Sequence, residues 1–337
     1  MNSTFTVRLI ATIAWGTCLA TISCPARGAE ERGGGVEGAR AETRQSCADA
    51  WIVSTRHAPL ARPVGFDPDR FSYQRRDEIR KGWTAATAEA FFEPALAEVP
   101  IVVFVHGNRA DQCKAVNQGL PILHRLQRDS AGRPFRLVIW AWPADRIGGG
   151  PRQDALVKAA RSDVQSYYLA EWLDRLPAEA PVLLIGYSFG ARVIAGALHL
   201  AGGGQLAGWQ LQRDTREAER RPARVMLIAA ALDSEWLLPG GRNGLAFHGI
   251  DELLITSNCL DPVLRLYPRM RRGDRSSALG FAGPACPWRL SDAGLRFESV
   301  RVECQVGREH DWCAYLGSPA VDSRLARYAF PADEAER

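Results

Sequence analysis

The run VLLIGYSFGARVI occupies residues 182–194, with the pattern Gly-x-Ser-x-Gly at residues 186–190. An apolar stretch of strand length precedes this pattern, and an apolar helical pattern follows it. A serine between a buried strand and a helix can sit on a sharp, strained turn that exposes its hydroxyl oxygen. Gly186 and Gly190 lack the Cβ atoms that would collide across such a turn. We therefore predict a strand, a tight turn and a helix, with Ser188 as a candidate nucleophile.

Apolar runs of strand length alternate with amphipathic helical patterns along most of the chain. Residues 101–105 (IVVFV) have no polar face, as expected of a strand buried on both sides. Strands that alternate with helices predict crossover connections and a mostly parallel sheet. We expect an α/β fold with a mostly parallel eight-stranded sheet flanked by helices, in a single domain over residues 47–330. The eight strands are expected at residues 51–55, 70–73, 101–105, 137–142, 181–185, 224–228, 252–256 and 297–302.

The N-terminus has the pattern of a secretory signal peptide over residues 1–29. A positively charged start leads into the apolar run Leu9–Ile22, and Ala26 and Gly28 provide small residues at a cleavage site. The apolar run is short for a bilayer-spanning helix. We expect export to the periplasm or the cell exterior, with lipidation of Cys24 as an alternative that would attach the chain to a membrane. Residues 30–46 are Gly-rich and charged, which is typical of a flexible tether.

Export would place the cysteines in a compartment where disulfides persist. The chain has eight cysteines, and six remain after a signal that contains Cys18 and Cys24 is removed. We expect disulfide bonds, with buried free thiols as the alternative. The suggested pairs are Cys47–Cys113, Cys259–Cys286 and Cys304–Cys313. The spacing Cys-x-x-Cys does not occur, so we expect no metal site.

The sequence His106-Gly107-Asn108 directly follows the buried strand at residues 101–105. A loop at this place in a strand–turn–helix hydrolase supplies one backbone N–H to the oxyanion hole. Gly107 allows the backbone to approach a substrate closely. We expect the N–H groups of Asn108 and Phe189 to form the oxyanion hole, and we expect a structural role for His106.

A serine hydroxyl needs a base to remove its proton, and the base needs a carboxylate that orients it. Of the six histidines in the chain, only His310 follows the last expected strand, so we predict it as the base. Two acids are candidates, because Asp261 follows the seventh expected strand and Asp233 follows the sixth. We favour Asp261, and Asp233 remains the alternative. The order Ser188, Asp261, His310 is the one found in α/β-hydrolases.

Several stretches together resemble the α/β-hydrolase superfamily, and within it a bacterial group of esterase/lipase-like serine hydrolases. The stretches are WIVSTR (51–56), VHGN (105–108), IWAWP (139–143), the serine turn, AALD (230–233), TSNCLD (256–261), His310 and Tyr315-Leu316. The resemblance implies the α/β-hydrolase fold and a serine mechanism. One departure concerns the acid: the group commonly has adjacent Asn and Asp after the seventh strand, whereas Cys259 and Leu260 separate Asn258 from Asp261 here.

These residues together predict an exported serine hydrolase that cleaves carboxylic esters through an acyl-enzyme on Ser188. The expected partner is a small-molecule or lipid ester, and no cofactor is required. A thioesterase, an amidase or a transacylase would use the same three residues. A second class of function is a non-catalytic protein of this fold that binds a ligand. The net charge of +4 is too small to indicate a nucleic-acid partner.

Overall fold

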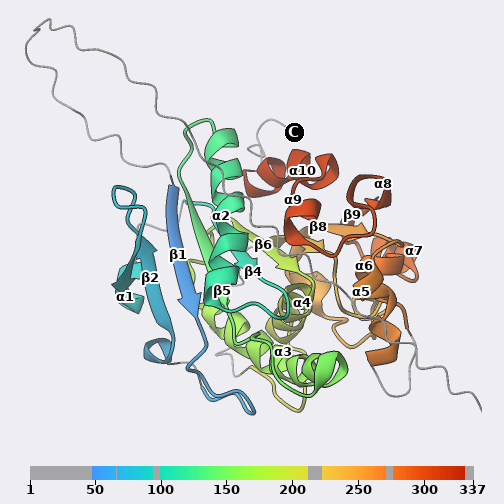
Figure 1. Cartoon of the computed structure of the whole chain (residues 1–337). Coiled ribbons are helices and arrows are strands. Elements are labelled where there is room, and N and C mark those ends of the chain that lie inside the picture. Colours follow the sequence, from blue (N-terminus) through green and yellow to red (C-terminus); the bar gives the residue numbers. More distant parts are fainter. Residues whose placement is uncertain (1–47, 66, 94–98, 212–221, 271–275, 331–337) are drawn as a thin grey trace, which may run out of the picture. The chain divides into compact units, whose positions relative to one another are not determined.

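The computed structural model describes residues 48–65, 67–93, 99–211, 222–270 and 276–330. The predicted signal peptide (1–29), the predicted tether (30–46), Cys24 and Cys47 lie outside these residues. The described residues are arranged around one sheet of nine strands (Figure 1).

The strands follow the order β3-β2-β1-β5-β4-β6-β7-β8-β9 across the sheet. They are β1 (Ala48–Ser54), β2 (Ser72–Arg76), β3 (Trp83–Ala86), β4 (Ile101–Val105), β5 (Phe135–Ala141), β6 (Val182–Tyr187), β7 (Ala223–Ile228), β8 (Ile250–Ser257) and β9 (Arg296–Arg301). In this spatial order, each neighbouring pair in the series β1-β5-β4-β6-β7-β8-β9 is parallel. The strand β2 pairs antiparallel with both β1 and β3. The predicted mostly parallel sheet is confirmed.

The expected number of eight strands is wrong, because the sequence prediction missed β3. This strand has four residues, and none of them is buried. It is held by backbone hydrogen bonding to β2 at the edge of the sheet, with Trp83 opposite Arg76. A strand held by pairing alone, without a buried face, leaves no apolar pattern in the sequence.

Helices cover the sheet and lie in many of the connections between its strands. They are α1 (Ala88–Phe91), α2 (Gln112–Asp129), α3 (Gly150–Asp174), α4 (Phe189–Ala201), α5 (Pro262–Arg265), α6 (Leu279–Ala282), α7 (Pro287–Asp292), α8 (Glu303–Val306), α9 (Trp312–Leu316) and α10 (Pro319–Ala329). Short 3₁₀ helices lie at Pro68–Arg70, Ala246–Gly249 and Tyr267–Met270. In the described part of the chain, no helix combines the length and the apolar character needed to cross a membrane.

Adjacent residues of β5 show how helices lie on both faces of the sheet. Ile139 faces α2, where a Cβ added at Gly119 would lie 2.5 Å from the Ile139 side chain. The next residue, Trp140, points to the opposite face and packs edge-on against Trp172 of α3 at 5.5 Å between ring centroids. Both faces of β5 are therefore covered, and an almost continuously apolar strand is stable there.

The parallel strands bring distant segments together at their carboxyl ends. Because β4, β6 and β8 run in the same direction, their carboxyl ends lie on the same side of the molecule. The segments that follow these three strands carry His106-Gly107-Asn108, Ser188 and Asp261. In an open α/β sheet, ligands bind outside the carboxyl ends of the strands.

The described cysteines are free thiols, at positions 113, 259, 286, 304 and 313. The expected pairs Cys259–Cys286 and Cys304–Cys313 are not formed, and Cys47 lies outside the described residues. Six cysteines allow 15 pairings, among which the sequence cannot choose. A disulfide requires Cα atoms within about 7 Å and converging side chains. Cys304 lies in α8 and Cys313 in α9, with the segment that carries His310 between them.

Candidate active site

Ser188 lies on the turn between β6 and α4. Its backbone has φ 53° and ψ −114°, a strained conformation for a residue other than glycine. Two hydrogen bonds hold the turn against the end of β7 and the segment that follows it. The Ser188 N–H donates to the Ile228 carbonyl at 2.9 Å, and the Ala231 N–H donates to the Ser188 carbonyl at 3.1 Å. The local backbone is therefore the strained strand–turn–helix that the sequence predicts for this serine.

Both glycines of the motif occupy positions where a larger residue would collide with the backbone. A Cβ at Gly190 would lie 1.9 Å from the carbonyl oxygen of Val105, the last residue of β4. A Cβ at Gly186 would lie 2.6 Å from the Cα of Ala191. Backbone atoms cause both collisions, so no side-chain rotation could relieve them. The turn therefore packs directly against the end of β4.

The structure brings Ser188, His310 and Asp261 together. The His310 Nε2 lies 3.1 Å from the Ser188 Oγ, and the His310 Nδ1 lies 2.6 Å from the Asp261 Oδ2. These are hydrogen-bond distances on both sides of the imidazole. The arrangement is that of a nucleophile, a base and an orienting acid.

Asp261, and not Asp233, contacts His310. The Asp261 side chain is fully buried. Asp261 is the N-cap residue of α5, and its Oδ1 accepts hydrogen bonds from the N–H groups of Val263 and Leu264 at 2.9 and 3.0 Å. This leaves Oδ2 for His310. The Asp233 Oδ1 instead accepts a hydrogen bond from the Tyr267 hydroxyl at 2.6 Å.

A nine-stranded mostly parallel sheet and the strained serine turn after β6 confirm the predicted architecture. The chain has an α/β-hydrolase fold. No protein-family model matches the sequence, and a comparison with curated proteins gives no match.

Solved structures with detectable similarity include three esterases or hydrolases. Esterase B from Lactobacillus rhamnosis is 13% identical, with 87% of this chain and 89% of that chain covered and a TM-score of 0.37. An S-formylglutathione hydrolase from Agrobacterium tumefaciens is 14% identical, with coverages of 77% and 95% and a TM-score of 0.37. Carboxyl esterase 2 from Tuber melanosporum is 12% identical, with coverages of 82% and 90% and a TM-score of 0.39. At these scores the neighbours carry no information on the reaction, which has to come from the site itself.

The loop after β4 lies against the nucleophile. A Cβ at Gly107 would lie 3.1 Å from the Ser188 Cβ and 3.0 Å from the Tyr187 ring, so this loop approaches the serine closely. Asn108 follows Gly107 in this loop, and Phe189 is the first residue of α4. N–H groups in the first turn of a helix have no acceptor within the helix. Both predicted oxyanion donors thus come from segments that adjoin Ser188.

His106 has the surroundings of a structural residue. Its ring is fully buried and stacks on Trp142 at 5.7 Å, and its Nδ1 donates to the Gly107 carbonyl at 2.9 Å. Burial lowers the pKa of His106 to about 4, so the ring is neutral at ordinary pH. The Trp142 Nε1 donates to the His106 carbonyl at 2.8 Å and fixes the start of the loop.

Two tyrosines, whose roles the sequence does not indicate, contact His310 and Asp261. The Tyr187 hydroxyl donates to the His310 carbonyl at 2.9 Å, and its ring stacks on the imidazole at 5.5 Å between centroids. The Tyr315 hydroxyl donates to the Asp261 Oδ2 at 2.8 Å. Burial raises the pKa of both phenols, which keeps them protonated as donors. Tyr187 could have been suspected from its place beside Ser188, and Tyr315 was named in the sequence only as part of the family resemblance, without a role.

The described residues offer no group of three or more His, Cys, Asp or Glu side chains that could hold a metal ion.

Proposed function

We propose that the protein is a serine hydrolase that cleaves carboxylic ester bonds through an acyl-enzyme on Ser188. The observation that carries this proposal is the continuous path of contacts from the Ser188 Oγ through both nitrogens of His310 to the Asp261 Oδ2, at 3.1 and 2.6 Å. A buried carboxylate at one imidazole nitrogen selects the tautomer whose other nitrogen can accept the serine proton.

In the first half-reaction the Ser188 Oγ attacks the ester carbonyl carbon while the His310 Nε2 takes the serine proton. Asp261 stabilises the imidazolium that forms, because its Oδ2 accepts a hydrogen bond from the His310 Nδ1. The imidazolium then gives its proton to the leaving alcohol oxygen as the carbon–oxygen bond breaks. Water repeats the sequence on the acyl-enzyme and releases the acid.

The N–H groups of Asn108 and Phe189 are the proposed donors to the oxyanion of each tetrahedral intermediate. Their segments adjoin Ser188 on two sides, one after β4 and one at the start of α4. Each such donor typically contributes about 3–4 kcal/mol to the stability of the transition state.

Small or short-chain esters are the proposed substrates. The connection between β7 and β8, at residues 229–249, contains turns and the short 3₁₀ helix Ala246–Gly249. It contains no long helix that could act as an interfacial lid over the site. A series of p-nitrophenyl esters of increasing acyl length tests this part, and we expect the highest kcat/KM for the shortest chains.

Export is the proposed location, supported by the signal-like pattern of the first 29 residues. Mass spectrometry of the intact protein from culture medium and cell fractions tests it. An N-terminus near residue 29 supports release, and a lipid adduct on Cys24 supports membrane attachment. An uncleaved chain in the cytoplasm contradicts export.

A fluorophosphonate probe tests the nucleophile directly. We expect stoichiometric labelling of the wild type and none of Ser188→Ala, which removes only the hydroxyl oxygen. Ser234→Ala is a matched control, because Ser234 is also buried and takes no part in the triad contacts. A folded wild type that is not labelled would instead support a non-catalytic binding protein. Labelling that persists in Ser188→Ala would place the nucleophile elsewhere.

A further inference from the structure

A second buried polar cluster lies beside the loop that carries Asn108. Its centre is an ion pair between Asp154 and Lys158, which lie one turn apart near the start of α3. Both side chains are completely buried. Charged side chains are almost never fully buried unless they are paired and hydrogen-bonded, because the loss of hydration is costly.

The Asp154 carboxylate is fully hydrogen-bonded. Its Oδ2 accepts from the Asn108 Nδ2 at 3.0 Å and from the Arg109 Nε at 2.9 Å. Its Oδ1 accepts from the Lys158 Nζ at 3.0 Å and from the Ile147 N–H at 3.1 Å. Burial alone would raise the pKa of Asp154, but the hydrogen bonds from Arg109 and Lys158 outweigh it and lower the pKa to about 2. The carboxylate is therefore ionised at every pH relevant to hydrolysis.

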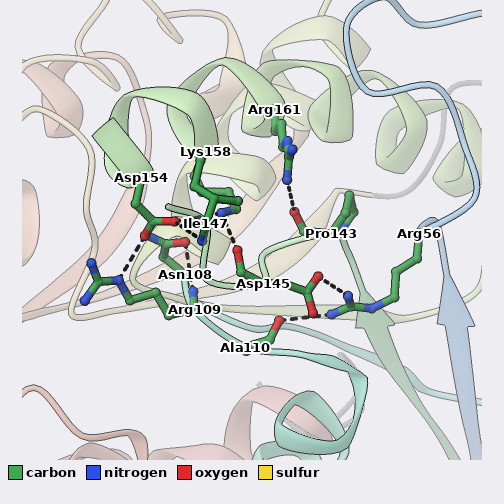
Figure 2. A network of polar contacts seen from close by, with 10 residues as sticks. All are labelled: Arg56, Asn108, Arg109, Ala110, Pro143, Asp145, Ile147, Asp154, Lys158 and Arg161. Carbon is green, nitrogen blue, oxygen red and sulfur yellow. Dashed lines mark hydrogen bonds and ion pairs between the residues drawn. The ribbon is translucent and has the colours of Figure 1, made fainter. Parts of the chain in front are cut away.

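Two of these four contacts belong to the loop that lies against Ser188. The Asn108 side chain points toward α3 and the Asp154 carboxylate (Figure 2). The Asn108 Oδ1 also accepts from the Arg109 N–H at 2.8 Å. Arg109 has φ 58°, in the left-handed region that residues other than glycine rarely adopt. The loop is thus held in a strained conformation by side-chain contacts.

A second set of contacts ties the end of this loop to its neighbours. The Arg56 guanidinium donates to the Ala110 carbonyl at 2.9 Å and pairs with the Asp145 carboxylate. The Lys158 Nζ donates to the Asp145 carbonyl. Ala110 and Ala144 also form an isolated antiparallel bridge. Segments after β1, β4 and β5 are therefore joined around the first turns of α3 (Figure 2).

We propose that Asp154 is a positioning residue that holds Asn108, and with it the backbone N–H of the oxyanion hole, in register with Ser188. The inference rests on the proposed ester hydrolysis. Asp154 itself touches no reacting atom. Its contribution is geometric, because an N–H group displaced by about 1 Å from the oxyanion can lower the rate about 100-fold.

Asp154→Asn tests the proposal. An asparagine at this site replaces one carboxylate oxygen by an NH₂ group, which donates and cannot accept. One pair of donors, either Asn108 and Arg109 or Lys158 and Ile147, therefore loses its acceptor, and the negative charge that holds both pairs is removed. We expect kcat for p-nitrophenyl acetate to fall by about 10- to 100-fold with little change in KM, as for a weakened oxyanion contact. The Ki of an alkylboronic acid, which forms a tetrahedral adduct on the serine, is expected to rise by a similar factor.

Asp163→Asn is the matched control. Asp163 also lies on α3, is largely buried and pairs with Arg192 and Arg242, but it does not touch the Asn108 loop. We expect this variant to lose thermal stability while kcat stays within about twofold of the wild type.

Asn108→Ala covers the case in which Asp154→Asn does not fold. Alanine keeps the backbone N–H and removes the link to Asp154, so a tenfold or greater loss of kcat with a parallel rise in the boronate Ki supports the proposal. Folded Asp154→Asn or Asn108→Ala with kcat within twofold of the wild type overturns it. A wild type that the fluorophosphonate does not label is a separate result, which refutes the proposed hydrolysis itself.

Discussion

Tyr315→Phe removes the hydroxyl that donates to the acid of the triad and keeps the aromatic ring. The Tyr315 hydroxyl and the His310 Nδ1 both bind the Asp261 Oδ2, at 2.8 and 2.6 Å. Tyr315 and Asp261 are both completely buried. After the substitution the carboxylate keeps its contacts to His310 and to the start of α5, but no water can easily replace the lost donor.

The expected losses of stability and activity follow from the type of hydrogen bond that is removed. A hydrogen bond to a charged group typically contributes about 1.5–3 kcal/mol to folding, and we expect the free energy of unfolding to fall by that amount. In the reaction, Asp261 must hold His310 while the imidazolium forms. If about half of the lost energy is expressed in the transition state, kcat/KM falls by about 3- to 12-fold, since about 1.4 kcal/mol corresponds to tenfold.

Tyr267→Phe is a close control for this substitution. Tyr267 is also buried, and its hydroxyl donates to the carboxylate of Asp233, the acid that does not reach His310, at 2.6 Å. We expect both variants to lose similar stability in urea unfolding, but only Tyr315→Phe to lose kcat/KM for p-nitrophenyl acetate. Equal losses of activity in the two variants, or full activity in a destabilised Tyr315→Phe, would refute the assigned role of the Asp261 contacts.

Three other substitutions have outcomes that the structure specifies. Gly190→Ala places a Cβ 1.9 Å from a carbonyl of β4, so we expect loss of fluorophosphonate labelling, whereas Gly82→Ala has open space and should be labelled normally. Asp261→Asn should lower kcat about 10³- to 10⁴-fold, as loss of a triad acid does, and Asp233→Asn should leave kcat within threefold; the reverse ranking in steady-state assays would reassign the acid. Burial lowers the His106 pKa from 6.5 to about 4, so unfolding takes up a proton and stability should fall by up to about 3 kcal/mol as the pH drops through this range. His106→Gln should flatten that dependence in urea unfolding at pH 4–7, and an unchanged slope would contradict the assignment.

That Ser188 and His310 lie near an aspartate could be predicted, because each candidate residue follows a strand of the expected sheet. Ser188 follows an apolar strand and precedes a helix, and Asp261 and His310 follow later strands in chain order. Parallel strands bring their carboxyl ends to one edge, so chain order alone places the three segments near one another. The prediction needed no knowledge of side-chain packing.

The Asp154 cluster could not be predicted in the same way. An aspartate and a lysine four residues apart are typical of the solvated face of a helix, where such pairs stabilise the helix slightly. In the structure the segments at residues 106–110 and 143–147 lie over this part of α3 and bury both charges. That burial depends on the loops after two other strands, and the residue pattern of α3 itself does not indicate where those loops lie.

The choice between Asp261 and Asp233 depended on a turn that the sequence only partly indicates. Cys259 and Leu260 separate Asn258 from Asp261, which would be expected to move the acid away from the strand end. The structure absorbs these two residues in a turn: the Leu260 N–H donates to the Asn258 Oδ1 at 3.0 Å, and the Asp261 N–H donates to the Asn258 carbonyl at 3.2 Å. Such side-chain-to-backbone bonds are typical of asparagine at the start of a turn.

The same asparagine also fixes the histidine side of the site. The Asn258 Nδ2 donates to the Gly307 carbonyl at 2.8 Å, three residues before His310. One buried side chain therefore holds the start of the acid's turn and the segment that carries the base. Cys259 and Leu260 are accommodated in this turn, and Asn258 connects the segment that carries Asp261 to the segment that carries His310.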